Sequence, residues 1–173
     1  MKKITQVTAA LVALMFASSA YAAEALREGS TEFGIQGDVV FQSAAGTDAS
    51  VSLRAGHFVV DGIQVGAFGS FADNDIDSRW GGGLFAEYNL LADTPIVPFV
   101  GISGAYNRSE PSGLKNTDAF VLGGEAGGKY FLAANTALTL SYLFEFASDD
   151  IFVDDYELDD TNHSIQLGLR FHF

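Results

Sequence analysis

Apolar and polar residues alternate one by one along eight segments of the sequence. The pattern is most regular in the last segment, where Ile165, Leu167 and Leu169 are apolar and Ser164 and Gln166 lie between them. A period of two with one apolar and one polar side indicates β-strands whose two faces meet different surroundings. The predicted strands span residues 31–42, 49–59, 62–72, 79–91, 96–107, 117–132, 136–147 and 162–173.

The connections between these strands alternate in length. The short ones are 59–62, 91–95 and 132–136, and the longer, polar ones are 42–50, 72–78, 108–116 and 147–160. Short turns at one end and long loops at the other are typical of outer-membrane barrels. We therefore predict an all-β fold, an eight-stranded antiparallel up-and-down transmembrane β-barrel. An even number of strands puts both ends of the barrel sequence on the short-turn side.

Aromatic residues on the apolar face sort by height if the first strand runs outward. Near the outer ends are Phe41, Phe71, Trp80, Tyr106, Phe120, Phe144 and Phe146, and near the inner ends are Phe33, Tyr88, Tyr130, Phe171 and Phe173. Aliphatic residues and glycine lie between these two sets, as in the aromatic girdles of membrane barrels. The alternative is a soluble, lipocalin-like barrel with its apolar face inward. Such a barrel has no reason to band its aromatic residues, so the pattern favours the membrane barrel.

The polar face supplies the lumen. Eight strands enclose an interior just wide enough for side chains to fill it. The predicted lumen network consists of Glu32, Asp38, Arg54, Glu87, Glu125, Lys129 and Arg170. Glu32 and Arg170 are expected to be neighbours, because the last strand must close onto the first. Two interpretations remain: a salt-bridge network that fills the lumen, or a gate whose ion pairs rearrange to pass small ions. The inward positions of Phe68, Phe85, Phe99 and Phe131 favour the filled lumen.

The N-terminal residues have the pattern of a secretory signal. A basic start at Lys2 and Lys3 precedes an apolar run, and Ala20 and Ala22 have the spacing of an A-x-A cleavage site. We expect residues 1–22 to be a cleaved signal peptide of the Sec type and residues 23–173 to be the barrel domain. Cleavage removes both lysines, which changes the formal charge from −13 to −15.

Composition narrows the possible functions. The negative charge argues against nucleic acid as a partner. The sequence has 0 Cys, so no disulfide stabilises the exported protein. Its 19 Gly and 15 Phe are spread along the chain, which suits crowded strands better than helices. No cofactor is expected.

The signal sequence, the alternating strands and the terminal Phe173 together resemble the small outer-membrane β-barrel family of the OmpA/OmpX type. The sequence ends with the eighth predicted strand, so the resemblance to OmpA concerns its membrane part, without a periplasmic domain. The resemblance implies a monomer in the outer membrane of a Gram-negative bacterium, surrounded by lipid and lipopolysaccharide. It also implies that Phe173 acts as the assembly signal for the barrel-assembly machinery, reached with the help of periplasmic chaperones.

The long loops are acidic. Asp73, Asp75 and Asp77 alternate in one loop, and the last loop is denser still in carboxylates. The first set resembles an EF-hand, but Ser78 stands where glycine is needed, so we reject that motif. One interpretation is weak binding of divalent cations that bridge to lipopolysaccharide phosphates, and the favoured one is a solvated, repulsive surface. The apolar set Ile151, Phe152, Val153 and Tyr156 within the last loop suggests either a partner contact or an extension of the seventh strand.

Catalysis finds little support. His163 and Ser164 are adjacent, but adjacent strand residues point to opposite faces and do not easily share a proton. His57 is expected to face lipid and His172 the inner mouth. We therefore predict a non-enzymatic barrel with a structural or surface-interaction role carried by its acidic loops. The alternatives are a narrow passive channel and, less favoured, a lipid-A-modifying enzyme.

Overall fold

The computed structural model describes residues 24–39, 49–73, 77–91, 96–111, 117–149, 151–154 and 157–173. Its strands are β1 (Thr31–Val39), β2 (Ala49–Val60), β3 (Ile63–Asp73), β4 (Asp77–Asn89), β5 (Ile96–Pro111), β6 (Thr117–Ala133), β7 (Thr136–Ala147), β8 (Phe152–Asp154), β9 (Glu157–Asp159) and β10 (Thr161–His172). Residues 24 and 25 form a short helical turn. In the described part of the chain, no helix is both long enough and apolar enough to cross a membrane.

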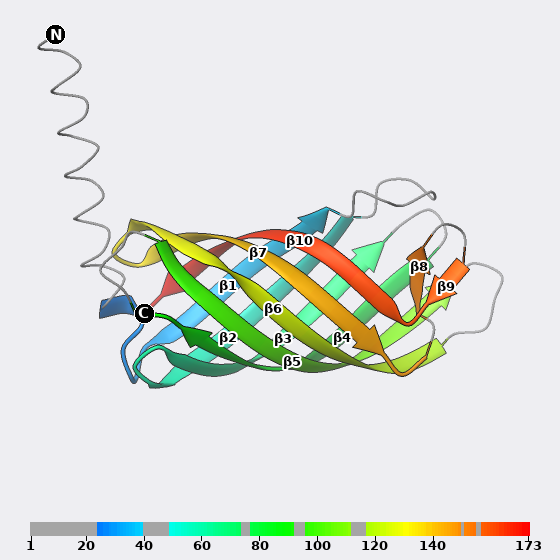
Figure 1. Cartoon of the computed structure of the whole chain (residues 1–173), viewed down its shortest axis with the longest axis horizontal. Helices are drawn as coiled ribbons and strands as arrows, with labels where there is room; N and C mark the ends of the chain where they lie inside the picture. Colours follow the sequence, from blue (N-terminus) through cyan, green and yellow to red (C-terminus); the bar gives the residue numbers. More distant parts are fainter. Residues whose placement is uncertain are drawn as a thin grey trace, which may run out of the picture.

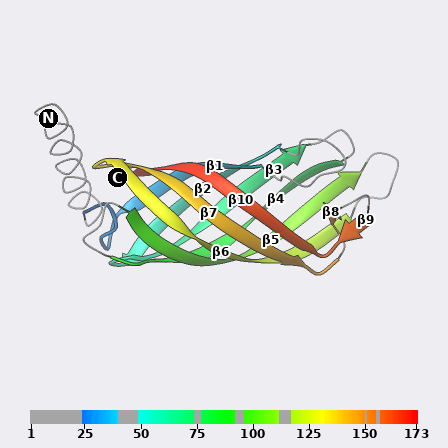
Figure 2. The ribbon, with the colours of Figure 1, turned by 45° about the horizontal axis from the view of Figure 1, so that its top comes forward.

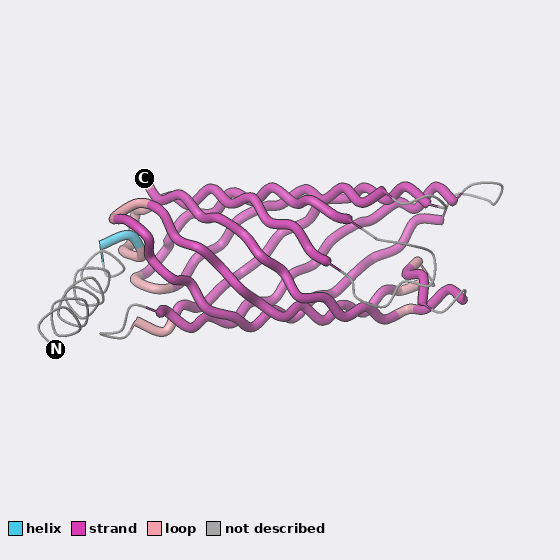
Figure 3. Tube along the Cα trace, turned by 90° about the horizontal axis from the view of Figure 1, so that it is seen from above, coloured by secondary structure: helices cyan, strands magenta, loops and turns pink. Residues whose placement is uncertain are grey.

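Eight strands close into a barrel in the order β1-β10-β7-β6-β5-β4-β3-β2, and all their pairings are antiparallel (Figures 1 and 3). The seam joins β1 to β10, with Phe33 opposite Phe171 and Gly34 opposite Arg170. Closure matters because an open sheet edge in lipid leaves backbone groups unpaired, at several kcal/mol each. The predicted fold is confirmed, and the regular ending of the sequence is the strand that closes the barrel.

The strand ends differ from the prediction mainly at the outer end. β3 runs to Asp73 and β4 begins at Asp77, so most of the predicted 72–78 loop is strand, which corrects that prediction. β5 continues to Pro111, which stands at the strand end where proline is tolerated. β5 and β6 have 16 and 17 residues. A membrane needs about 9–11 residues per strand, so both strands extend past the bilayer thickness. The strands incline strongly around the barrel (Figure 2).

The apolar face is the outer face. Leu84 and Ile102 are 69% and 70% exposed, and aliphatic residues of the other strands accompany them. Soluble monomers rarely expose apolar surface of this extent, so the outer face suits lipid. The inner face is buried: along β10, exposed residues alternate with buried ones from His163 to His172.

The aromatic residues predicted for the girdles are exposed on this outer face. Phe71 lies opposite Trp80, and the rings of Tyr106 and Phe120 meet edge to face at 6.0 Å. At the other end, the Phe33 and Phe173 rings meet edge to face at the same distance. The exposed members are Phe71, Trp80, Tyr106, Phe120, Phe144 and Phe146 at the outer end and Phe33, Tyr88, Tyr130, Phe171 and Phe173 at the inner end. Phe41 lies outside the described residues.

Candidate functional site in the barrel lumen

The inner half of the lumen holds a buried lysine between two carboxylates. Lys129 Nζ on β6 lies 2.6 Å from Glu32 Oε2 on β1 and 2.6 Å from Glu87 Oε1 on β4. None of the three side chains is more than 1% exposed. A charge buried this deeply needs close opposite charges, because an unpaired one costs several kcal/mol. The three residues therefore act as one unit that crosses the lumen.

Arg54 on β2 extends this unit toward mid-height. Its Nη2 lies 3.0 Å from Glu87 Oε2, and its Nη1 lies 3.3 Å from Glu125 Oε2 on β6. Ser141 Oγ donates a hydrogen bond of 2.7 Å to the other oxygen of Glu125. The Arg54 guanidinium also stacks 3.8 Å from the centre of the Phe85 ring. Carboxylates and cations thus alternate without a break from Glu32 to Glu125.

Arg170 closes the same layer at the barrel seam. Its Nε lies 3.5 Å from Glu32 Oε1, and its Nη2 donates a hydrogen bond of 2.5 Å to Gln36 Oε1. Gln36 Nε2 donates in turn to Gln166 Oε1 at 2.6 Å. Room for Arg170 comes from Gly34, because a Cβ atom there would lie 2.2 Å from Arg170 Nη1. The glycine makes a gap on the lumen face that the long guanidinium side chain fills.

The structure brings most of the predicted lumen residues together. Glu32, Arg54, Glu87, Glu125, Lys129 and Arg170 make the contacts above. Asp38 lies on β1 opposite Gln166 and Ser50, and its side chain lies outside the described ones. Sequence reasoning missed Asn89, whose Nδ2 donates to Glu87 Oε1 at 3.0 Å and to Gly62 O at 3.3 Å. Its polar-face position was the available signal.

An apolar plug closes the inner mouth beneath the charged layer. Leu26, which is 0% exposed, packs with residues of four strands inside the barrel. Its carbonyl oxygen accepts a hydrogen bond of 2.8 Å from the Gly62 amide, at the turn between β2 and β3. The cluster comprises Ala25, Leu26, Phe58, Val97, Phe131 and Ala137. The sequence analysis did not foresee this plug, because residues 24–30 show no alternation that marks them as part of the barrel.

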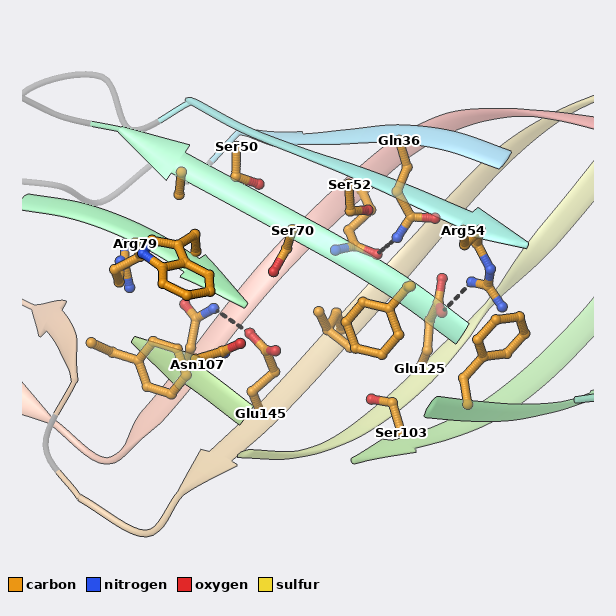
Figure 4. A pocket seen from close by; sticks show the side chains of 18 residues that line it. Gln36, Ser50, Ser52, Arg54, Ser70, Arg79, Ser103, Asn107, Glu125 and Glu145 are labelled. Carbon is orange, nitrogen blue, oxygen red and sulfur yellow. Dashed lines mark hydrogen bonds and ion pairs between the residues drawn. The ribbon is translucent and has the colours of Figure 1, made fainter. Parts of the chain in front are cut away.

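The outer half of the lumen holds a cavity of about 150 Å³ above Arg54 and Glu125 (Figure 4). Its walls carry hydroxyl groups of Ser52 and Ser70, which pair across β2 and β3, and of Ser103 on β5. We name this space the outer chamber, bounded by the charged layer below and by Phe152 above. Serines at several inward positions help to leave it open, although Arg79 and Glu145 also line it, whereas long charged side chains fill the inner half.

Two apolar residues of the last loop fold into the outer mouth. Ile151 and Phe152 are 1% and 6% exposed, and Phe152 begins the small hairpin β8-β9. They pack against small inward residues of β5, β6 and β7, namely Ala105, Ala119, Val121 and Ala147. The expectation that this stretch extends β7 is therefore wrong, because β7 ends at Ala147 and the hairpin is a separate sheet. Of the same stretch, the Val153 side chain and Tyr156 lie outside the described parts.

The histidines form no catalytic arrangement in the described structure. His163 is exposed on the lipid face, where its Nδ1 lies 2.5 Å from the Tyr142 hydroxyl oxygen. Ser164 is 4% exposed and faces the lumen. His57 is exposed and within 3.3 Å of Thr31 Oγ1, and His172 is buried at the inner mouth. Among the described residues, no group of three or more His, Asp or Glu side chains is arranged to hold a metal ion. Several acidic loop residues, including Asp75 and Asp155, lie outside that part.

No family model matches the sequence, and no curated protein sequence matches it either. Several solved structures, in contrast, are similar to the structure of this chain. The N-terminal β-barrel domain of Pseudomonas aeruginosa OprF aligns with a TM-score of 0.65 at 18% identity, covering 84% of this chain and 98% of that one. Neisserial surface protein A aligns with a TM-score of 0.62 at 16% identity, over 83% and 96%.

A third similar structure is the outer-membrane protein OprG from Pseudomonas aeruginosa, with a TM-score of 0.54 at 14% identity over 85% of this chain and 97% of that one. Identities this low establish the fold alone. The resemblance seen in the sequence is thus confirmed at the level of fold, and the chain has the fold of the small eight-stranded outer-membrane β-barrels.

Proposed function

We propose that this protein is a sealed, non-enzymatic barrel of a Gram-negative outer membrane, with a structural or surface-interaction role. The observation that carries the proposal is the unbroken line of ion pairs from Glu32 through Lys129, Glu87 and Arg54 to Glu125. It crosses the lumen from β1 to β6, so an ion moving along the barrel axis meets it. The lipid-facing aliphatic band and the two aromatic girdles support the membrane setting.

Charge balance explains why this layer seals. Each carboxylate in it already has a cation within 3.5 Å, so a passing ion gains an interaction only by breaking one. Breaking a buried pair leaves an uncompensated charge, at about 3–5 kcal/mol. Leu26 and Phe131 in the apolar plug add a second closure on the inner side. A narrow passive channel requires both closures to move together.

The proposed role outside the barrel rests on charge. The sequence carries 22 Asp and Glu against 9 Lys and Arg, and the last predicted loop is rich in carboxylates. Such a surface repels anionic partners, and divalent cations can bridge it weakly to lipopolysaccharide phosphates. Hydrophobic residues on the barrel exterior support a lipid setting, and in this proposal the protein is a monomer there.

The proposed route to the membrane uses both ends of the sequence. Residues 1–22, which lie outside the described residues, would direct Sec-type export and be cleaved. Phe173 at the end of the alternating last strand would be the assembly signal for the barrel-assembly machinery, after escort by periplasmic chaperones. β10 pairs with both β1 and β7, which makes its docking the step that closes the barrel.

Conductance in planar lipid bilayers tests the sealed lumen. We expect no regular openings from the purified wild-type barrel. A variant with Lys129→Ala, Glu87→Ala and Leu26→Ala removes charge and bulk from both closures, and its openings would show that the assay detects an open lumen. Regular openings of the wild type resembling those of this variant would overturn the sealed barrel in favour of the passive channel.

The lipid-A profile tests the absence of an enzyme separately. Expression of the protein in a Gram-negative host is expected to leave the acyl chains of lipid A unchanged, compared with a His163→Ala variant and with an empty vector. A new or missing acyl chain that depends on His163 would contradict the non-enzymatic role.

A further inference from the structure

The outer chamber has the wall chemistry of a small binding site. Hydroxyl groups come from Ser52, Ser70 and Ser103, and amides come from Asn107 and Asn162 (Figure 4). These groups stand on β2, β3, β5 and β10, so they surround the space rather than line one side. Hydroxyls and amides both donate and accept hydrogen bonds, which suits a ligand that does the same.

The charged side chains that line the chamber, Arg54, Arg79, Glu125 and Glu145, already have partners. Arg54 binds Glu87 and Glu125, and Glu145 accepts a hydrogen bond of 2.9 Å from Asn162 Nδ2. A charged ligand would have to displace one of these partners, whereas an uncharged one would not. Two buried polar atoms, Asn107 Oδ1 and Arg54 Nε, have no hydrogen-bond partner among the described residues. Both atoms are buried in the wall, Asn107 Oδ1 against Gly81, so the hydrogen-bonding capacity open to a ligand lies in the serine hydroxyls and the other amide atoms that line the chamber.

Apolar faces complete the walls. Phe68, Phe85 and Phe152 line the chamber together with its polar groups. Ring faces beside hydroxyls and amides suit a molecule that presents both C–H and O–H groups. The cavity of about 150 Å³ has room for several water molecules, each of which takes about 30 Å³. The size therefore admits a solute of a few heavy atoms.

Phe152 stands at the outer side of the chamber. Phe152 is both a lining residue and a buried member of the apolar cluster with Val121 and Ala147. Its ring lies 5.8 Å from the Arg79 guanidinium on β4. Ile151 and Phe152 pack against three alanines, Val121 and Phe68, and the only charged group among their described contacts is the Arg79 guanidinium, so they can leave without breaking an ion pair of their own. We name these two residues the stopper.

We propose that the outer chamber binds small uncharged polyols of the glycerol class, which enter from the cell exterior when the stopper lifts. The charged layer below keeps the bound solute from passing through. This site is additional to the sealed-barrel function: the barrel can be sealed without binding a solute, and the chamber can bind a solute even if ions leak past the layer.

The test uses the full mature barrel in lipid nanodiscs, prepared without glycerol and titrated with glycerol, while side-chain amide signals are followed by NMR. We expect saturable shifts of the Asn107 and Asn162 amides. The Asn89 amide at the inner end, buried below the charged layer, serves as the reference in the same sample and should not move. Absence of shifts, linear shifts without saturation, or equal shifts of Asn89 would each overturn the proposal.

Variants and related solutes sharpen the result. Ser52→Leu fills one wall and should weaken the glycerol response about tenfold, and Ser103→Leu fills the opposite side should the first variant fail to fold. Raffinose, which exceeds the cavity, and glycerol 3-phosphate, which is charged, should give no saturable shift. Phe152→Ala should speed exchange of glycerol with the chamber. A response to glycerol 3-phosphate as strong as that to glycerol, or one unchanged in the filled variants, would contradict an uncharged-solute site in this chamber.

Discussion

At the inner end of the lumen, Lys129 lies between two carboxylates with no exposed surface, whereas at the outer end hydroxyls such as that of Ser52 border a cavity of about 150 Å³. Both halves are built on strands with the same alternation. The difference comes from side-chain length: Arg54 and Lys129 reach across a narrow barrel, and serine does not. An eight-stranded barrel is thus filled or hollow at a given height according to which residues occupy its inward positions.

The two ends also differ in how the mouth is closed. At the inner end Leu26 is held by backbone hydrogen bonds as well as packing, because its carbonyl accepts from the Gly62 amide. At the outer end Phe152 is held by packing on small residues. A backbone hydrogen bond adds to apolar burial at the inner closure, so we expect the outer closure, held by packing and by the contact of Phe152 with Arg79, to open at lower cost. The following predictions test this contrast.

The largest expected effect follows loss of the central cation. Lys129→Met should lower the free energy of unfolding by about 3–5 kcal/mol, because Glu32 and Glu87 then face each other without it. Equilibrium urea unfolding in lipid vesicles, followed by fluorescence of the single Trp, Trp80, measures the loss. Adding Glu32→Gln to Lys129→Met should restore part of the lost stability, because the remaining carboxylate, Glu87, still has its ion pair with Arg54. A loss below 1 kcal/mol would mean that the inner layer is hydrated like the outer chamber.

The sequence allowed much of this inner layer to be predicted. Alternation places Glu32, Glu87 and Lys129 on the polar face, and antiparallel order puts them at similar heights. Closure of the last strand onto the first predicts that Arg170 is a neighbour of Glu32, and Arg170 Nε lies 3.5 Å from Glu32 Oε1. Period and topology suffice here because each residue's height and face follow from its strand position.

The closures at the two mouths were beyond the same reasoning. Residues 24–30 and the last loop have no period, so neither face nor height follows from their sequence. Leu26 and Phe152 find their positions through three-dimensional gaps, in Phe152's case a niche left by Ala105, Ala119 and Ala147. Such a gap depends on which small residues meet across different strands. It emerges once the register is known.

The next effect in size concerns the inner plug. Leu26→Ala should destabilise its segment by about 2–3 kcal/mol through lost packing. Hydrogen exchange of the Gly62 amide, which donates to Leu26 O, should then quicken about 30-fold or more. The Ile165 amide in β10 is the control and should keep its rate. Unchanged exchange at Gly62 would show that the plug does not depend on Leu26, and the contrast with the outer stopper would fail.

A smaller loss of stability is expected when a methyl group is added at Gly34, where the inner half of the lumen is crowded. In Gly34→Ala the new methyl group would lie 2.2 Å from Arg170 Nη1 and 2.8 Å from Arg54 Cγ. Both side chains can shift, so the expected cost is about 1–2 kcal/mol. Gly124→Ala is the matched control on the lipid face, because its Cβ would meet no atom within 4 Å. Equal stabilities of the two variants in the same urea assay would contradict a tightly filled inner lumen.

The smallest expected quantity is a difference between two asparagines that each donate to a glutamate, one in each half of the lumen. Asn89 is 0% exposed and donates to Glu87 at 3.0 Å, whereas Asn162 donates to Glu145 at 2.9 Å beside the outer chamber. Asn89→Ala should cost about 2 kcal/mol, because Glu87 and the Gly62 carbonyl then lose a donor in a fully buried place. Asn162→Ala should cost less than about 1 kcal/mol, because chamber water can take over the hydrogen bond to Glu145. Urea unfolding of the two variants under identical conditions measures this difference of about 1 kcal/mol. Equal costs would mean that the outer chamber excludes water as fully as the charged layer does. The two halves of the lumen would then differ in shape but not in how their polar groups are hydrated.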